Sequence, residues 1–172
     1  MNFDNQQFVI FAYSISNIVG LLMLWAAIKR TRLARVLFVL LFTWASWTNY
    51  TASHQHPEVY LDYAKFSVGF YKDFINGWFR NHTVEMVTLV SICQALISLG
   101  MLLNGTWVRL ACIGTIVFLV GIAPLGVGAA FPFSLIVSLA AYFILRNDRK
   151  DYLWKNNTGR SLNTLNHEYG SK

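Results

Sequence analysis

Long apolar runs alternate with short polar segments along the chain, and five of these runs predict helices that cross a membrane. About 20 apolar residues are needed to cross a hydrocarbon core of about 30 Å. Pro124–Pro132 divides the last apolar stretch, which is too long for a single crossing. The predicted spans are residues 8–28, 33–50, 84–103, 107–123 and 131–145. The pattern therefore predicts an all-α, polytopic membrane bundle of about five transmembrane helices, in which a four-helix core is joined by one N-terminal span.

A different, amphipathic pattern marks residues 57–80. Polar and apolar residues recur there at intervals of three and four, which places the two kinds on opposite faces of a helix. Such a helix typically lies flat at the membrane interface. Gly69 leaves open whether the segment forms one helix or two. The polar face would hold Glu58, Asp62, Lys65, Gly69, Lys72, Asp73, Asn76 and Arg80, and the apolar face Val59, Tyr63, Phe66, Phe70, Phe74 and Trp78.

Composition and charge support a membrane location and set its predicted orientation. The chain is 55% hydrophobic and 13% charged, outside the usual balance of globular proteins. Its basic residues gather in the Lys29–Arg35 loop, at Arg109 and in the tail of residues 146–172. Because cytoplasmic loops are rich in Lys and Arg, these three regions are predicted to be cytoplasmic and the N-terminus to lie outside. We expect a multi-pass protein of the cytoplasmic (inner) membrane, with residues 1–145 as one transmembrane domain and no affinity for nucleic acid.

Several polar residues fall inside the predicted spans. Asn17 lies in the first span beside the small-residue pair of Ser16 and Gly20, while Gln94 follows the third span's Ser91 by one turn. Lipid cannot satisfy such groups, so interhelical hydrogen bonds are the simplest interpretation. The alternative is that they line a polar cavity between the helices. Two seams at helical spacing are predicted to face neighbouring helices: Ser91, Gln94 and Ser98, and Ser134, Ser138 and Tyr142.

Glu85 and His82 are the candidate ligand-binding residues at the start of the third span. An acid in the first turn complements the helix dipole, and His82 or Asn81 would be the cap residue. In the alternative, Glu85 and His82 face a pocket under the amphipathic helix and exchange protons with a quinone. Trp78 and Tyr63 belong to a set of aromatics that would wall such a pocket, or anchor the segment at the interface. The ligand-pocket candidates are therefore Glu85, His82, Gln94, Asn17, Trp78 and Tyr63.

His54 and His56 form the candidate metal site. Alternate residues of an extended segment project to the same side, so the two imidazoles could share a zinc or copper ion. Their spacing matches no recognised ligand motif, and solvated interfacial histidines are the simpler interpretation. The sequence contains no GxSxG, Walker A, HExxH or GxGxxG motif, so no catalytic residue is assigned.

Residues 35–145 share their layout with a known family. A span leads into an outside segment, residues 52–57 followed by 59–63, and three closely spaced spans follow with a break at residues 123–126. In this layout the chain resembles the DoxX-like family of small bacterial membrane proteins. It departs from that family in residues 36–47, which lack the glycines typical of the first core helix. The resemblance implies a helical bundle in the cytoplasmic membrane, sometimes linked to electron transfer from sulfur compounds to quinone, and it carries over no catalytic residue.

Two functional hypotheses follow from these features. The first is a non-catalytic subunit or accessory component of a membrane complex, in contact with membrane lipids and with a membrane-protein partner or a second copy of the chain. The second is a membrane oxidoreductase component that binds a quinone or a lipid. No resident cofactor is predicted, and a quinone or bound lipid would be the ligand under the second hypothesis.

Overall fold

The structure, a computed structural model, describes residues 3–129, 131–147 and 152–153. This part of the chain is helical nearly throughout and contains no strand, which confirms the all-α prediction. The elements are α1 (Phe3–Lys29), α2 (Thr31–Gln55), η1 (Pro57–Lys65), α3 (Gly69–Phe74), η2 (Ile75–Phe79), α4 (Thr83–Leu102), α5 (Thr106–Ile122), η3 (Ala123–Ala129) and α6 (Phe133–Asn147). Most of the predicted basic tail, residues 146–172, lies outside the described residues.

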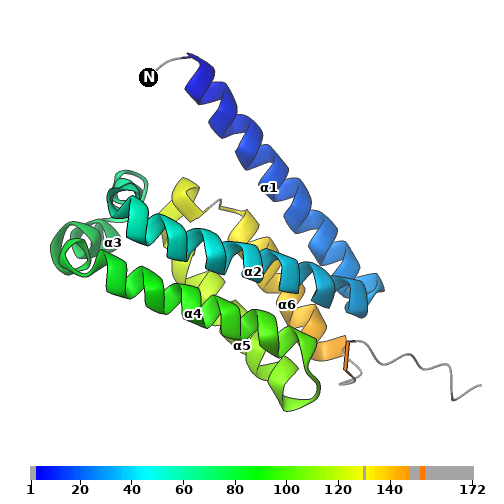
Figure 1. Ribbon diagram of the computed structural model, residues 1–172. Coiled ribbons are helices and arrows are strands. Elements are labelled where there is room, and N and C mark those ends of the chain that lie inside the picture. Colours follow the sequence, from blue (N-terminus) through cyan, green and yellow to red (C-terminus); the bar gives the residue numbers. More distant parts are fainter. Residues whose placement is uncertain (1–2, 130, 148–151, 154–172) are drawn as a thin grey trace, which may run out of the picture.

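Helices α2, α4, α5 and α6 run side by side (Figure 1). The C-terminal half of α1 packs on α6 and α2, whereas its N-terminal half diverges from the other helices (Figure 1). The helices approach closely because small residues lie at their contacts. Ala27, Ala34, Ala140 and Ala141 are fully buried in the same core cluster as Phe38. A tight turn joins α4 to α5 at Gly105, whose φ of 55° suits glycine.

Two helical runs in the described part of the chain are long and apolar enough to cross a membrane. They are Thr83–Leu102 and Thr106–Gly126, with 20 and 21 residues. The α1 and α6 regions contribute shorter apolar stretches, Tyr13–Lys29 and Phe133–Asn147. The 25-residue helix α2 is long enough but carries Arg, Ser, Thr, Asn and His along its length, which lowers its hydropathy. By length and composition, two of the five predicted spans therefore meet the requirement for a crossing.

The amphipathic segment is divided into two short helical pieces across the outer end of α2 and α4 (Figure 1). The segment therefore does not form one continuous helix, since η1 ends at Lys65 and α3 begins at Gly69. The bundle-facing side differs from the predicted apolar face, because Tyr60, Ala64 and Ile75 are the buried side chains. Most of the predicted apolar face is exposed: Val59, Phe66, Phe70, Phe74 and Trp78.

Hydrogen bonds to backbone carbonyls attach this segment to the region between α5 and α6. The Val68 amide donates to the Pro124 carbonyl at 3.3 Å, and the Tyr71 hydroxyl donates to the Gly121 carbonyl at 2.6 Å. Gly126 has a φ of 63°, and a Cβ there would lie 2.9 Å from the Phe66 carbonyl oxygen. Glycine is therefore required at this contact on both conformational and steric grounds.

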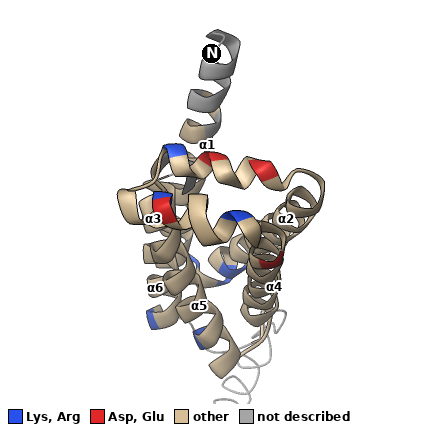
Figure 2. Ribbon diagram, turned by 90° about the vertical axis from the view of Figure 1, so that its left-hand side faces the viewer, with Lys and Arg blue, Asp and Glu red and all other residues tan. Residues whose placement is uncertain are grey.

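Charged side chains lie at the two ends of the bundle (Figure 2). Those acidic side chains that the structure describes gather at the end formed by η1, α3 and the start of α4: Glu58, Asp62, Asp73 and Glu85. Lys65, Lys72 and Arg80 lie at this same end. The opposite end, at the α1–α2 turn, the α4–α5 turn and the end of α6, holds Lys29, Arg30, Arg32, Arg35, Arg109 and Arg146. The described part of that second end contains no acidic side chain.

Candidate functional site

A polar seam joins α2 to α4 along the middle of the bundle. Thr43 Oγ1 and Ser98 Oγ lie 2.8 Å apart, and the Ser46 hydroxyl donates to the Ser91 carbonyl at 2.8 Å. Ser91, Gln94 and Ser98 are buried, which confirms that they share one face turned toward a neighbouring helix. These bonds favour the interhelical interpretation of Gln94 and Ser98 over a polar cavity.

Asn49 links three elements at the outer end of this seam. Its Nδ2 donates to Gln94 Oε1 of α4 at 2.9 Å. The Tyr60 hydroxyl of η1 donates to Asn49 Oδ1 at 3.0 Å and lies 3.2 Å from the Asn49 carbonyl oxygen. The Tyr60–Asn49–Gln94 network therefore attaches η1 to helices α2 and α4.

A double-mutant cycle tests whether this network stabilises the fold. Asn49→Leu leaves buried polar atoms of Gln94 and Tyr60 without a partner, so we expect a loss of about 1–3 kcal/mol in the free energy of unfolding. Asn49→Leu combined with Gln94→Leu is expected to recover part of it, with a coupling of about 0.6 kcal/mol. Unfolding in mild detergent measures both quantities. Strictly additive losses would show that the two amides do not interact.

Burial, and then the neighbouring Tyr63 phenol, raises the pKa of the Tyr60 hydroxyl to about 12. Desolvation has this effect because it disfavours the charged phenolate. Burial also raises the pKa of Tyr63, whose ring packs edge-on against Tyr60 with centroids 5.9 Å apart.

The stability of the protein is predicted to fall in alkaline solution. Below the ordinary pKa of 10.0, Tyr60 is protonated in both the folded and the unfolded chain. As the pH rises toward about 12, the unfolded chain releases the proton first, so the unfolded state is favoured. Thermal unfolding across this range should show a decline that Tyr60→Phe reduces and that the exposed Tyr142→Phe leaves unchanged. An equal decline in both variants would exclude Tyr60 as its source.

An open groove of about 420 Å³ follows the α2–α4 seam on the outer surface of the bundle. Its lining combines the hydroxyl-bearing side chains of Thr43, Ser46, Ser91 and Ser98, here termed the floor, with the exposed side chains of Trp47, Tyr50, Ile92 and Leu99, here termed the rim. Pockets of this size bind small molecules when they combine an apolar lining with a few polar groups. The lining residues are Thr43, Ser46, Trp47, Tyr50, Ser91, Ile92, Ala95, Ser98 and Leu99.

The candidates at the start of α4 lie outside this groove. Glu85 is exposed in the first turn of α4, where an acid complements the helix dipole. His82 occupies the N-cap position without a side-chain capping bond. Its ring stacks on Trp78 with centroids 4.3 Å apart, and its Nδ1 lies 3.0 Å from the Trp78 carbonyl oxygen. The exposed position of Glu85 supports the structural interpretation of this residue.

Asn17 lies at a separate interface of the fold. Its Nδ2 donates to the Tyr13 carbonyl of its own helix at 2.9 Å, while its Oδ1 is buried without a hydrogen-bond partner. Gly20 is buried against α6, where an added Cβ would lie 3.0 Å from Phe133 Cδ2. Gly20 therefore faces a neighbouring helix. None of the six ligand-pocket candidates lines the α2–α4 groove.

The seam predicted on α6 is correct for two of its three residues. Ser134 and Ser138 are buried, but Tyr142 is 47% exposed. The four-residue spacing drifts around a helix of 3.6 residues per turn, so the third position leaves the contact.

The two histidines of the candidate metal site make different contacts. His54 Nδ1 lies 2.8 Å from the Tyr50 carbonyl oxygen, whereas His56 Nδ1 lies 3.4 Å from Glu58 Oε1. Within residues 3–129, 131–147 and 152–153, no group of three or more His, Cys, Asp or Glu side chains is arranged to hold a metal ion. A two-imidazole site at His54 and His56 stays a prediction.

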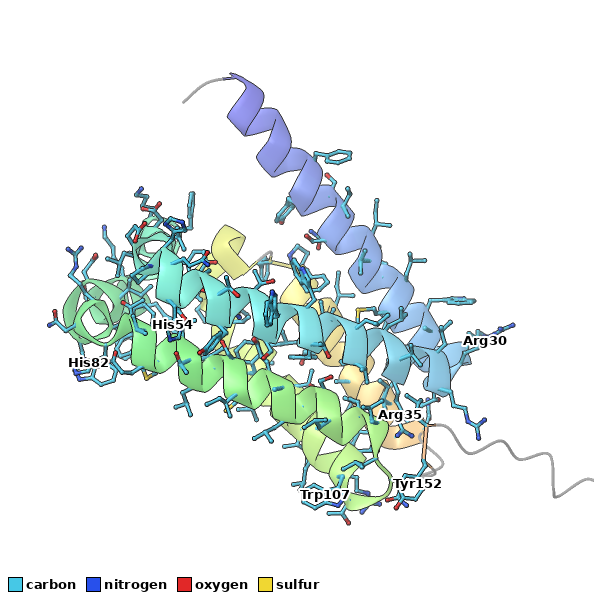
Figure 3. All side chains as sticks on the ribbon, viewed as in Figure 1. Arg30, Arg35, His54, His82, Trp107 and Tyr152 are labelled. Atoms are coloured by element: carbon cyan, nitrogen blue, oxygen red, sulfur yellow. The ribbon has the colours of Figure 1, made fainter. Side chains whose placement is uncertain are left out.

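Arg35 is a buried charged residue that sequence reasoning missed. It is 1% exposed and lies beside the α4–α5 turn at the end of the bundle, while Arg30 points away (Figure 3). Its Nε and Nη2 donate to the Met101 carbonyl at 2.9 and 2.8 Å, and Nη2 also donates to the Leu103 carbonyl. A guanidinium thus satisfies carbonyls at the C-terminus of α4 that have no helical partner. In the sequence, Arg35 looks like one more loop charge.

Comparison of the chain with known protein families, curated proteins and solved structures found no match.

Proposed function

We propose that the protein is a five-span integral membrane protein of the cytoplasmic membrane, with a DoxX-like layout and a non-catalytic, accessory role in a membrane complex. Large apolar side chains cover the outside of α1, α2, α4 and α5, such as the exposed Leu22, Leu40, Leu96 and Val117. In lipid this surface needs no further cover, and helices satisfy their own backbone groups. The end whose described charged side chains are all basic corresponds to the cytoplasmic side, with the N-terminus outside and the C-terminus inside.

The proposed orientation predicts which residues a membrane-impermeant thiol reagent reaches. In a background with Cys93→Ser and Cys112→Ala, single cysteines replace Asn76 or Arg30, which are exposed at opposite ends of the bundle. We expect the Asn76→Cys variant to be labelled in intact cells, and the Arg30→Cys variant only after the membrane is opened. Labelling of both positions in intact cells would contradict the orientation.

The single observation that carries the accessory role is the apolar surface of the outside segment. Phe70 is 79% exposed and Trp78 is 51% exposed, and Phe74 stacks on Trp78 with ring centroids 5.9 Å apart. Exposed apolar patches of this kind mark interaction surfaces. The partner is a membrane protein or a second copy of the chain, bound beside the polar stripe of Lys72, Asp73 and Asn76.

Native mass spectrometry after mild extraction tests the accessory role. A stoichiometric protein partner or a homo-oligomer is expected, and Phe70→Ser with Trp78→Ser should release it. Asn76→Ser, on the polar stripe of the same segment, is the matched control and should retain it. A monomer that turns over a substrate on its own would contradict the proposal.

The second candidate function, a component that binds a quinone or lipid, is favoured by the α2–α4 groove. Its lining contains hydroxyls and aromatic rings but no carboxylate or imidazole. Proton exchange by Glu85 or His82 would therefore take place outside the groove. This lining favours binding of an apolar chain over redox chemistry of a quinone ring.

A further inference from the structure

The hydroxyl groups on the floor of the groove are engaged in hydrogen bonds. The Thr43 hydroxyl donates to the Ser98 hydroxyl, and the Ser98 hydroxyl donates to the Val39 carbonyl oxygen at 3.2 Å. The Ser46 and Ser91 hydroxyls each donate to a backbone carbonyl, at 2.8 and 2.9 Å. With these donors engaged, the floor has no hydroxyl hydrogen left to donate to an occupant. A ligand that brings no polar group of its own therefore suits this floor.

The size of the groove suits a single extended chain. One turn of an α-helix, about 10 Å wide and 5.4 Å long, already occupies a volume close to 420 Å³. A transmembrane helix could therefore only lie across the rim. From Thr43 to Tyr50 the groove follows α2 for about 10 Å at 1.5 Å per residue. An alkyl chain aligned with the helices can follow this length.

The position of the groove identifies the leaflet from which the chain comes. Thr43 lies near the middle of α2, and Tyr50 lies near the end that joins η1. Trp47 and Tyr50 stand at the rim of that outer half, where aromatic side chains of membrane proteins meet lipid headgroups. The His54 ring packs on Tyr50 with centroids 4.4 Å apart, one turn closer to the charged outer end.

We propose that the α2–α4 groove is a binding site for one acyl chain of an outer-leaflet phospholipid. The chain lies between Trp47 and Ile92 over Ala95 and Ser98, and the headgroup lies at the level of His54. Lipid tails are as apolar as the groove, so the chain is held by packing contacts with these side chains and not by exclusion of water. The inference rests on the proposed membrane location.

Filling the groove tests the site against an adjacent control. Ala95→Phe places a ring among the lining residues, whereas Leu96→Phe adds a ring at a 62% exposed position outside the lining. After washing in detergent, native mass spectrometry counts the phospholipid retained by each variant. We expect one retained phospholipid in the wild-type and Leu96→Phe proteins, and about tenfold less in Ala95→Phe because packing contacts are lost. Ile92→Ala, which removes rim contacts without adding bulk, should also reduce retention.

Equal retention in the wild type, Ala95→Phe and Ile92→Ala would overturn the site, as would a wild-type protein that retains no phospholipid. Loss of a bound quinone or polypeptide from Ala95→Phe, with phospholipid unchanged, would overturn the acyl-chain assignment. Thiol labelling tests the membrane orientation independently, so failure of the groove and failure of the proposed topology are separable.

Discussion

Replacement of Arg35 by alanine is expected to lower the free energy of unfolding by about 3–5 kcal/mol. The substitution leaves the Met101 and Leu103 carbonyls without their guanidinium donor. Because the Arg35 side chain is only 1% exposed, its removal also leaves a cavity. A cation at this position also interacts favourably with the C-terminal end of the α4 dipole. Arg35 therefore acts as the cap of α4, supplied by the first turns of α2.

Unfolding of the purified protein in mild detergent measures this loss. Arg35→Lys keeps the charge but has no fork of donors, so we expect it to recover only part of the stability. Arg30→Lys, at the exposed turn before α2, is the matched control and should change the stability by less than about 0.5 kcal/mol. If Arg35→Lys is as stable as the wild type, the charge alone is sufficient, and a specific capping role of the guanidinium is excluded.

Gly100→Leu is expected to have the second largest effect, a loss of about 1–3 kcal/mol or more from overpacking. A Cβ on Gly100 would lie 2.8 Å from Ala111 Cβ and 3.1 Å from the Trp107 carbonyl oxygen. The second contact is with backbone, which cannot rotate away. The α4–α5 crossing therefore requires a residue without a side chain here.

Two variants separate this contact from general effects of changing glycine. Gly114→Ala is the control, because its Cβ would first meet Ile97 Cγ1 at 3.5 Å, an ordinary contact distance. Gly100→Ala should destabilise the protein, and Ala111→Gly in the same chain should restore part of the loss. If Gly100→Ala and Gly114→Ala are equally stable in detergent unfolding, the close approach is not a constraint.

The candidate site was partly predictable from sequence. Gln94 and Ser98 stand out because a polar residue in an apolar helix needs a partner, and both are bonded across the α2–α4 contact. Their partners Asn49 and Thr43 could not be chosen, because a one-residue change of register or rotation would present other polar residues of α2. Glu85 and His82 were predicted either to cap α4 or to face a pocket under the amphipathic segment, and neither residue lines the α2–α4 groove.

The sequence by itself determined the helical class of the protein, its apolar runs, the break at Pro124 and the burial of the polar face of α4, because these depend on local periodicity. Only the tertiary structure decided that Arg35 caps α4, that Asn49 joins three elements and that a groove opens between α2 and α4. Each of these depends on the rotation and spacing of helices distant in sequence. Packing of whole surfaces determines those quantities, and no single residue encodes them.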